Sequence, residues 1–140
     1  MKFIRSFIVV LICIMAPSMV QAADKLSVQD AHKLAQTGEI LLVDIRTPQE
    51  WRETKVGASA QTISMHSAEF LRNLESAIEG DKTKPIALIC ATGGRSQWLQ
   101  AQLLRRGYTK IYDVSEGVLG SSAGPGWLKA SLPLKDAPKP

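Results

Sequence analysis

The chain has 140 residues, a formal net charge of +4, 45% hydrophobic residues and 21% charged residues. This composition is typical of a soluble globular domain and excludes the collagen-like, low-complexity and disordered classes. Two cysteines are too few for a disulfide framework, so a hydrophobic core has to hold the fold. Basic and acidic residues are interleaved without a run of like charge, which argues against nucleic-acid binding.

The first 22 residues have the pattern of a secretory signal peptide. Two basic residues precede an apolar run over 7–15, and small residues lie three and one before a cleavage point after Ala22. Pro17 interrupts the apolar run, which is shorter than the about 20 residues of a membrane-spanning helix. We therefore predict a cleaved signal peptide over 1–22, a periplasmic or secreted mature domain over 23–140, and no membrane attachment after cleavage.

The mature chain alternates between helical periodicity and short apolar runs. Continuous apolar strands without polar alternation are typical of a parallel sheet that is covered on both faces. We therefore predict an α/β fold in which helices flank a central, mainly parallel sheet, with the ligand site beyond the carboxyl ends of the strands. The predicted elements, in chain order, are a helix between Ser27 and Gly38, a strand over 40–43, a helical turn over 50–52, a strand over 60–63, a helix over 70–78, a strand over 86–89, a helix over 96–106, a strand over 111–114 and a loop over 117–126.

Cys90 directly follows the predicted strand over 86–89 and is the single cysteine of the predicted mature chain. Gly93 and Gly94 lie between this strand and the next helix, where backbone N–H groups can turn toward one point and bind an anion. These amides, the positive helix end and Arg95 favour the thiolate over the thiol. We predict that Cys90 is a reactive nucleophile and not an inert buried side chain, and that Ser96 caps the helix or donates to the anion.

The segment Cys90-Ala91-Thr92-Gly93-Gly94-Arg95-Ser96 resembles the active-site loop Cys-x-x-Gly-x-Arg-Ser of the rhodanese-like sulfurtransferases. Asp44-Ile45-Arg46, followed by Glu50-Trp51, resembles the family's pattern Asp-x-Arg-x-x-x-Glu-aromatic. The closing strand at 112–114, with Gly117 and Trp127, is similar as well. The resemblance covers nearly all of the mature chain and implies the three-layer fold of that family.

One stretch departs from the family pattern. Thr54-Lys55-Val56 stands where the family has Gly-His-Ile, and Ser59-Ala60 stands in the place of its Gly-Ala. The entry to the second predicted strand is therefore the part of the chain that the resemblance predicts least well.

The resemblance implies a two-step sulfur transfer that needs no metal and no organic cofactor. Cys90 attacks the outer sulfur of a donor such as thiosulfate, releases sulfite and holds a persulfide, which a cyanide, thiol or protein acceptor then collects. It also implies that the loop amides stabilise the persulfide and that Arg95 orients the donor. The residues that the resemblance assigns to donor binding are Ala91, Thr92, Gly93, Gly94, Arg95 and Ser96.

Several other side chains have predicted roles. Asp44 and Arg46 support the site, and we expect them to brace the end of the strand by pairing, with Arg46 also lending positive potential. Trp98 is expected to be core or pocket wall, and Trp51 and Trp127 to be packing residues. His32 and His66 are expected to be surface or capping residues. Neither histidine lies in a cluster with metal-ligand spacing.

Three other functions are alternatives to compare with this loop. A non-enzymatic periplasmic sulfur carrier, or an anion-binding module of this family, would use Cys90 without efficient turnover. A cysteine phosphatase or arsenate reductase is disfavoured, because the phosphatase loop encloses five residues between cysteine and arginine and Cys90 and Arg95 enclose four. A thioredoxin-type reductase lacks its second cysteine.

Overall fold

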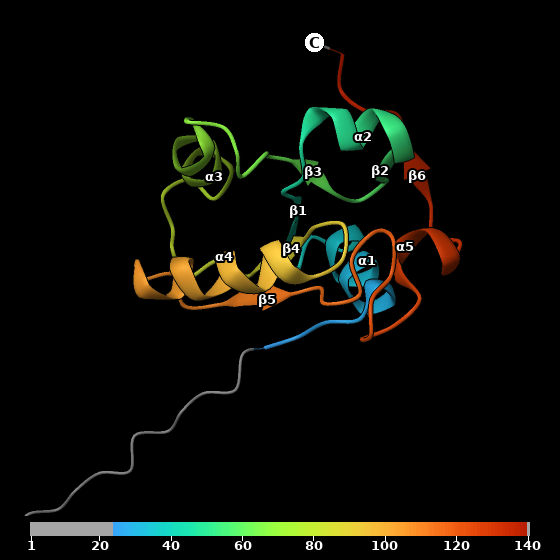
Figure 1. Cartoon of the computed structure of the whole chain (residues 1–140). Coiled ribbons are helices and arrows are strands. Elements are labelled where there is room, and N and C mark those ends of the chain that lie inside the picture. Colours follow the sequence, from blue (N-terminus) through green and yellow to red (C-terminus); the bar gives the residue numbers. More distant parts are fainter. Residues whose placement is uncertain (1–23, 140) are drawn as a thin grey trace, which may run out of the picture.

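The computed structural model describes residues 24–139, so the predicted signal peptide and its cleavage point lie outside the described residues. Two groups of helices lie on either side of a central sheet (Figure 1). The helices are α1 (Val28–Gln36), α2 (Pro48–Thr54), α3 (Phe70–Ala77), α4 (Gly94–Arg105) and α5 (Gly126–Lys129). The strands are β1 (Leu41–Asp44), β2 (Val56–Gly57), β3 (Gln61–Thr62), β4 (Ile86–Ile89), β5 (Ile111–Asp113) and β6 (Leu134–Lys135).

The central sheet has the strand order β3-β1-β4-β5, and all of its neighbours are parallel. This confirms the predicted α/β fold with a parallel sheet. After β1 the chain adds β3 on one side of the sheet, and after β4 it adds β5 on the other side. The direction in which strands are added therefore reverses between β1 and β4. Asp44 and Ile89, the last residues of these two strands, are partners in register. The structure therefore has its topological switch point next to Cys90, where ligand sites of parallel sheets lie.

Alternate strand residues enter two separate hydrophobic cores, one on each face of the sheet. Val43 and Leu88 point into the core that α3 and α4 cover, and Leu42 and Ala87 point into the core that α1 and α5 cover. Cys90 belongs to the first of these cores. Burial on both faces explains why the strand sequences show no polar alternation.

The structure agrees with most of the predicted elements and adds three. The strand over 86–89 is found as predicted, and α4 begins at Gly94 instead of Ser96 because Gly93, at φ +90°, turns the chain into the helix. The three elements that were not predicted are β2, β6 and α5, which have two to four residues each. Segments this short have no periodicity of their own, and their conformation depends on tertiary contacts.

The prediction for His32 was wrong. Its side chain is buried on the inner face of α1, its Nδ1 lies 2.8 Å from the Ser59 hydroxyl, and its ring meets the Trp127 indole edge-on at 5.3 Å. Trp51 and Trp127 are buried, as predicted for packing residues, and His66 is exposed. Within residues 24–139, no helix has the length and apolar character to cross a membrane.

Lys55 has a backbone conformation that residues with a side chain avoid. It follows α2 with φ 64° and ψ −174°, a region used almost only by glycine. Its exposed ion pair with Asp136 contributes little stability. The departure from the family pattern at 54–56 is therefore also a point of backbone strain.

We expect Lys55→Gly to increase the free energy of unfolding by about 0.5 to 1 kcal/mol, because glycine adopts this conformation without steric cost. Urea denaturation of the purified protein measures the change. The matched control is Lys55→Ala, which removes the same charge but keeps the Cβ and brings no gain. Equal stabilisation by both variants would mean that the lysine side chain, and not the backbone angle, is responsible.

Candidate active site

The loop that starts at Cys90 is shaped by a second loop that packs against it. Val118 N donates to Cys90 O and Leu119 N to Ala91 O, each at 2.9 Å. At Gly93 a Cβ atom would overlap the backbone oxygen of Ser115, so the positive φ and the close approach both require glycine here. Gly94 has no such requirement, since its Cβ position faces open space.

The thiol of Cys90 is buried, with 1% of the residue exposed, and has two polar neighbours. The backbone N–H of Gly93 donates to Sγ at 3.2 Å, and Sγ in turn faces the Ser96 hydroxyl at 3.4 Å. Ser96 does not cap α4, whose N-cap Gly93 has no side-chain hydrogen bond; that part of the prediction was wrong. The Ser96 hydroxyl donates instead to the buried carboxylate of Asp113 at 2.6 Å.

Arg95 is held by Glu50, a residue that was not predicted to belong to the site. The guanidinium binds the Glu50 carboxylate through two nitrogens, at 2.6 and 2.9 Å. Glu50 is also the third residue of α2 and completes the capping box that Thr47 begins, so its side chain is fixed at the start of α2. A capping-box glutamate is readable from the sequence. Its contact with a residue 45 positions later is not.

This ion pair changes the titration of both partners. The side-chain hydrogen bond from Arg95 is the largest cause that lowers the pKa of Glu50 from 4.5 to about 2, against the opposing effect of burial. The same hydrogen bond raises the pKa of Arg95. Both side chains are therefore charged at neutral pH, and their charges largely cancel. In this structure Arg95 is paired with Glu50 and is not a free cation.

Asp44 and Arg46 form a buried ion pair at the carboxyl end of β1. Arg46 Nη2 lies 2.7 Å from Asp44 Oδ2, and each side chain is 1% exposed. The remaining nitrogen donors of Arg46 bind Glu50 O, Thr54 Oγ1 and Lys55 O. Trp51 Nε1 donates to Asp44 Oδ1 at 3.1 Å. All of these contacts are internal, so Arg46 joins the end of β1 to α2 and to the residue before β2.

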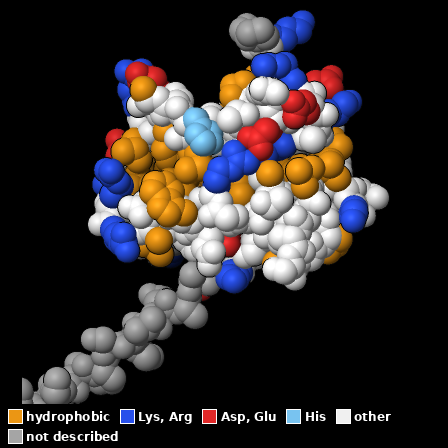
Figure 2. Space-filling model, viewed as in Figure 1, with side chains coloured by type: hydrophobic (Ala, Val, Ile, Leu, Met, Phe, Trp, Pro, Cys, Tyr) orange, Lys and Arg blue, Asp and Glu red, His pale blue; other side chains and the backbone are white. Residues whose placement is uncertain are grey.

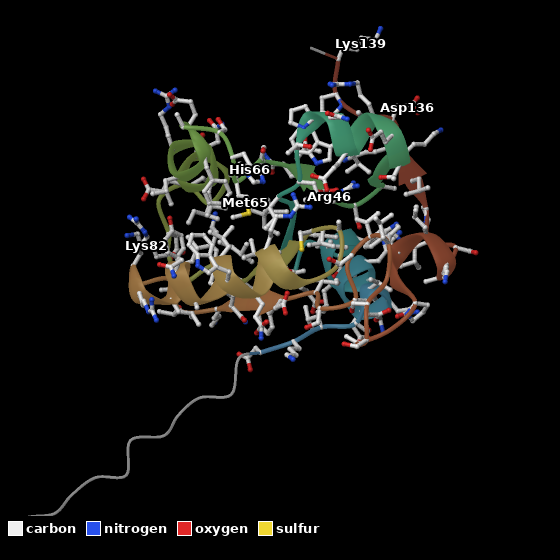
Figure 3. All side chains as sticks on the ribbon, viewed as in Figure 1. Arg46, Met65, His66, Lys82, Asp136 and Lys139 are labelled. Carbon is white, nitrogen blue, oxygen red and sulfur yellow. The ribbon has the colours of Figure 1, made fainter. Side chains whose placement is uncertain are left out.

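An apolar hollow lies between α3 and α4. It has a volume of about 270 Å³, and Met65, Leu71 and Trp98 are among the residues that line it. Trp98 is 58% exposed, so it is a wall of this hollow and not part of the core. Figure 2 shows the apolar surface next to basic, acidic and histidine side chains in the middle of the same face. Met65 and His66 lie in the segment that connects β3 to α3 (Figure 3).

The structure places Gly93 and Ser96 of the predicted loop in contact with Sγ, and it buries Arg46 within the framework. No group of three or more histidine, cysteine or acidic side chains in residues 24–139 could hold a metal ion. Two polar residues close to the loop were not predicted: Glu50 and Asp113. The only signal for Asp113 in the sequence is that a single carboxylate stands at the end of a predicted buried strand.

Comparison with known proteins gives one consistent result. The model of the rhodanese-like domain family matches residues 27–123. The chain is 28% identical over 104 residues to a sulfurtransferase of Allochromatium vinosum, with 74% of this chain and 86% of that protein aligned. It is 30% identical over 89 residues to the thiosulfate sulfurtransferase GlpE of Pseudomonas syringae pv. syringae, with 64% of this chain and 77% of that protein aligned.

Two solved structures have the same architecture. Rv0390 from M. tuberculosis has a TM-score of 0.60 at 25% identity, with 81% of this chain and 97% of that chain covered. The polysulfide-sulfur transferase homodimer from Wolinella succinogenes has a TM-score of 0.56 at 28% identity, with 81% of this chain and 79% of that chain covered.

We expect Asp44→Asn to lower the free energy of unfolding by about 3 to 5 kcal/mol, because it leaves the buried Arg46 charge without its partner. Urea denaturation measures the loss. The control is Asp136→Asn, which removes an exposed carboxylate that is also paired with a basic residue and has an effect within about 0.5 kcal/mol. A comparably small effect at Asp44 would contradict the bracing role.

The Glu50–Arg95 pair gives a pH-dependent contribution to stability. Because the pKa of Glu50 is lowered from 4.5 to about 2 in the folded state, the contribution is complete above pH 4.5 and is lost as the pH falls toward 2. We expect Glu50→Gln to cost about 1 to 2 kcal/mol at pH 7, a value reduced by solvent screening of the partly exposed pair, and less than about half of this at pH 3.

Urea denaturation of wild type and Glu50→Gln at several pH values tests this expectation. Glu53→Gln, at an exposed position of the same helix, is the control and has an effect within about 0.5 kcal/mol at each pH. A cost of Glu50→Gln that is the same at pH 7 and pH 3 would show that the ion pair does not lower the pKa of Glu50.

Proposed function

The chain belongs to the rhodanese-like domain family, and from this membership we propose that it is a sulfurtransferase that carries sulfane sulfur as a persulfide on Cys90. The observation that carries the proposal is the place of the Cys90 thiol. It lies at the switch point of the parallel sheet and accepts a hydrogen bond from the Gly93 amide, at the start of α4. Relatives that are named as sulfurtransferases support it.

The proposed reaction has two steps at one sulfur atom. The Cys90 sulfur attacks the outer sulfur of a donor such as thiosulfate, a new S–S bond forms, and sulfite leaves with the electron pair of the bond that breaks. A thiophilic acceptor, cyanide or a thiol, then attacks the outer sulfur of the persulfide and releases Cys90. The outer sulfur stays about 2 Å from Sγ and within the reach of the loop.

Backbone groups, and not a free cation, stabilise negative charge in this proposal. Arg95 is neutralised by Glu50, and Arg46 is neutralised by Asp44 in the framework below. The donors that remain are the amides of the loop after Cys90 and the N-terminus of α4, whose helix dipole is positive at this end. Such a site suits a small anion whose charged atoms can face the loop amides. Ala91, Thr92, Gly93 and Gly94 supply backbone to it, and Arg95 supplies the anchor that holds the loop to α2.

Export and the acceptor are further parts of the proposal. The sequence pattern over 1–22 supports a periplasmic or secreted protein. The apolar hollow between α3 and α4 lies on the face that also carries His66, which suits contact with a larger thiol or a protein acceptor (Figures 2 and 3).

We expect the purified protein to gain one sulfur atom on Cys90 after incubation with thiosulfate and to lose it when cyanide is added. Intact-mass spectrometry with peptide mapping measures both steps. Cys90→Ser removes the nucleophile and is expected to gain no sulfur while its circular dichroism spectrum stays that of the wild type. Sulfur gain by Cys90→Ser would contradict the proposal.

Two further outcomes discriminate between the functions. A sulfur that thiosulfate adds and cyanide does not remove would favour a carrier that needs a protein partner. No gain by a wild-type protein whose thiol is shown to be reduced would overturn sulfur transfer from thiosulfate and favour an anion-binding module.

A further inference from the structure

Both arginines of the site, Arg46 and Arg95, are bound to carboxylates. Arg46 pairs with Asp44 at 2.7 Å, and both side chains are buried, so this pair stays within the framework. Arg95 pairs with Glu50 at 2.6 Å, and both of these side chains are partly exposed. An anion that approaches Arg95 therefore meets the charge of the carboxylate together with that of the guanidinium.

Arg95 is the member of this pair whose charge acts on the reactive sulfur. It lies two residues after Gly93, whose amide donates to Cys90 Sγ at 3.2 Å, and it interacts electrostatically with Cys90. Glu50 comes from α2 and binds both terminal nitrogens of the guanidinium. The carboxylate thereby reduces the positive potential that Arg95 supplies at the loop.

Glu50 is held in this position and stays charged. Its carboxylate also accepts a hydrogen bond from the backbone N–H of Thr47 at 3.0 Å, as part of the capping box of α2. The hydrogen bond from Arg95 is the largest cause that lowers the pKa of Glu50 to about 2, so the carboxylate is ionised at pH 7. The pairing is therefore a permanent property of the folded site at neutral pH.

The other polar and charged side chains near the loop do not add an excess of basic groups. Lys25 and Asp113, one basic and one acidic side chain, both line a polar hollow to which Gly93 also contributes. The ring of His66 lies beside the ion pair, with Nε2 3.5 Å from Arg95 Nη1. Although the chain has a net charge of +4, the described residues around the loop do not concentrate that charge there.

We propose that Glu50 sets the charge selectivity for the sulfur donor: by pairing with Arg95 it limits the advantage of doubly charged donors such as thiosulfate, so that singly charged donors, thiosulfonates and persulfides, compete with it for Cys90. This inference rests on the proposed function. Glu50 touches no donor and is a positioning residue that acts through Arg95.

Thiosulfate and methanethiosulfonate form a matched pair of donors for this question. Thiosulfate carries two negative charges and methanethiosulfonate carries one, and in both the outer sulfur is bound to a sulfonyl sulfur. The Cys90 sulfur forms a bond to the outer sulfur, the S–S bond of the donor breaks, and sulfite or methanesulfinate leaves with the electron pair. Because Coulomb energy is proportional to charge, a change in the charge of the ion pair acts about twice as strongly on the dianion, on a logarithmic scale.

The test compares the second-order rate constants with which the two donors load Cys90 at pH 7, followed by intact-mass spectrometry of quenched samples. Glu50→Gln keeps the shape of the side chain and an accepting oxygen for Arg95, but leaves the guanidinium charge unbalanced. We expect it to raise the rate constant by about tenfold for thiosulfate and about threefold for methanethiosulfonate, so that their ratio rises about threefold. Glu53→Gln removes an exposed carboxylate of the same helix and is expected to change the ratio by less than about 1.5-fold.

The ratio is expected to follow the net charge of the pair. Arg95→Gln leaves the carboxylate unbalanced and lowers the ratio of the thiosulfate to the methanethiosulfonate rate constant about threefold, and the double variant with Glu50→Gln returns the ratio to within about 1.5-fold of the wild type. A merely structural role of Glu50 would change both rate constants by the same factor. An unchanged or lowered ratio in Glu50→Gln overturns the proposal, whatever the activity of Arg95→Gln.

If Glu50→Gln fails to fold, the salt dependence of the wild type decides. We expect loading by thiosulfate to slow by less than about twofold between about 20 and about 200 mM salt, because no unbalanced positive charge attracts the dianion. A steeper decrease would show that such a charge acts at the site and would overturn the proposal.

Failure of this inference is distinct from failure of the proposed function. A wild-type protein that gains sulfur from neither donor refutes the proposed function, on which the inference rests. Sulfur gain with a ratio that does not respond to the charge of the pair refutes the role of Glu50 alone.

Discussion

The buried ion pair between Asp44 and Arg46 is the interaction on which the rest of the site depends. Arg46 is held by the carboxylate at the end of β1 and in turn holds the backbone of Glu50 and Lys55. It therefore fixes α2 over the carboxyl end of the sheet. α2 carries the Glu50 carboxylate, and that carboxylate holds Arg95 and with it the start of α4. The position of the loop at Cys90 follows from this sequence of contacts.

A second constraint comes from the backbone of the loop itself. The chain after β5 packs on the chain after β4 so closely that glycine is required at Gly93 and at Gly117. These contacts are between backbone groups, which have little freedom to move, so the amide of Gly93 points at Sγ before any donor binds. Preorganised dipoles of this kind stabilise charge without a reorganisation cost during the reaction.

The electrostatics of the site result from pairing and not from an excess of basic residues. Arg46 and Arg95 are each matched by a carboxylate within the fold. What remains near Sγ is a backbone N–H on one side and a hydroxyl bound to Asp113 on the other.

The sequence alone determined the fold class, the order of the main elements, the place of Cys90 and the family resemblance. Apolar runs, helix periodicity and a glycine-rich loop are local patterns that can be read from neighbouring residues. Burial on both faces of the sheet makes each strand a continuous apolar run. Only the tertiary structure decided that Glu50 binds Arg95, that Ser96 faces Asp113 instead of capping α4, and that His32 is buried. Each of these depends on side chains far apart in the sequence, such as the 45 residues between Glu50 and Arg95. Hydrogen bonds and ion pairs of this kind are set by distance and burial, which no local pattern encodes.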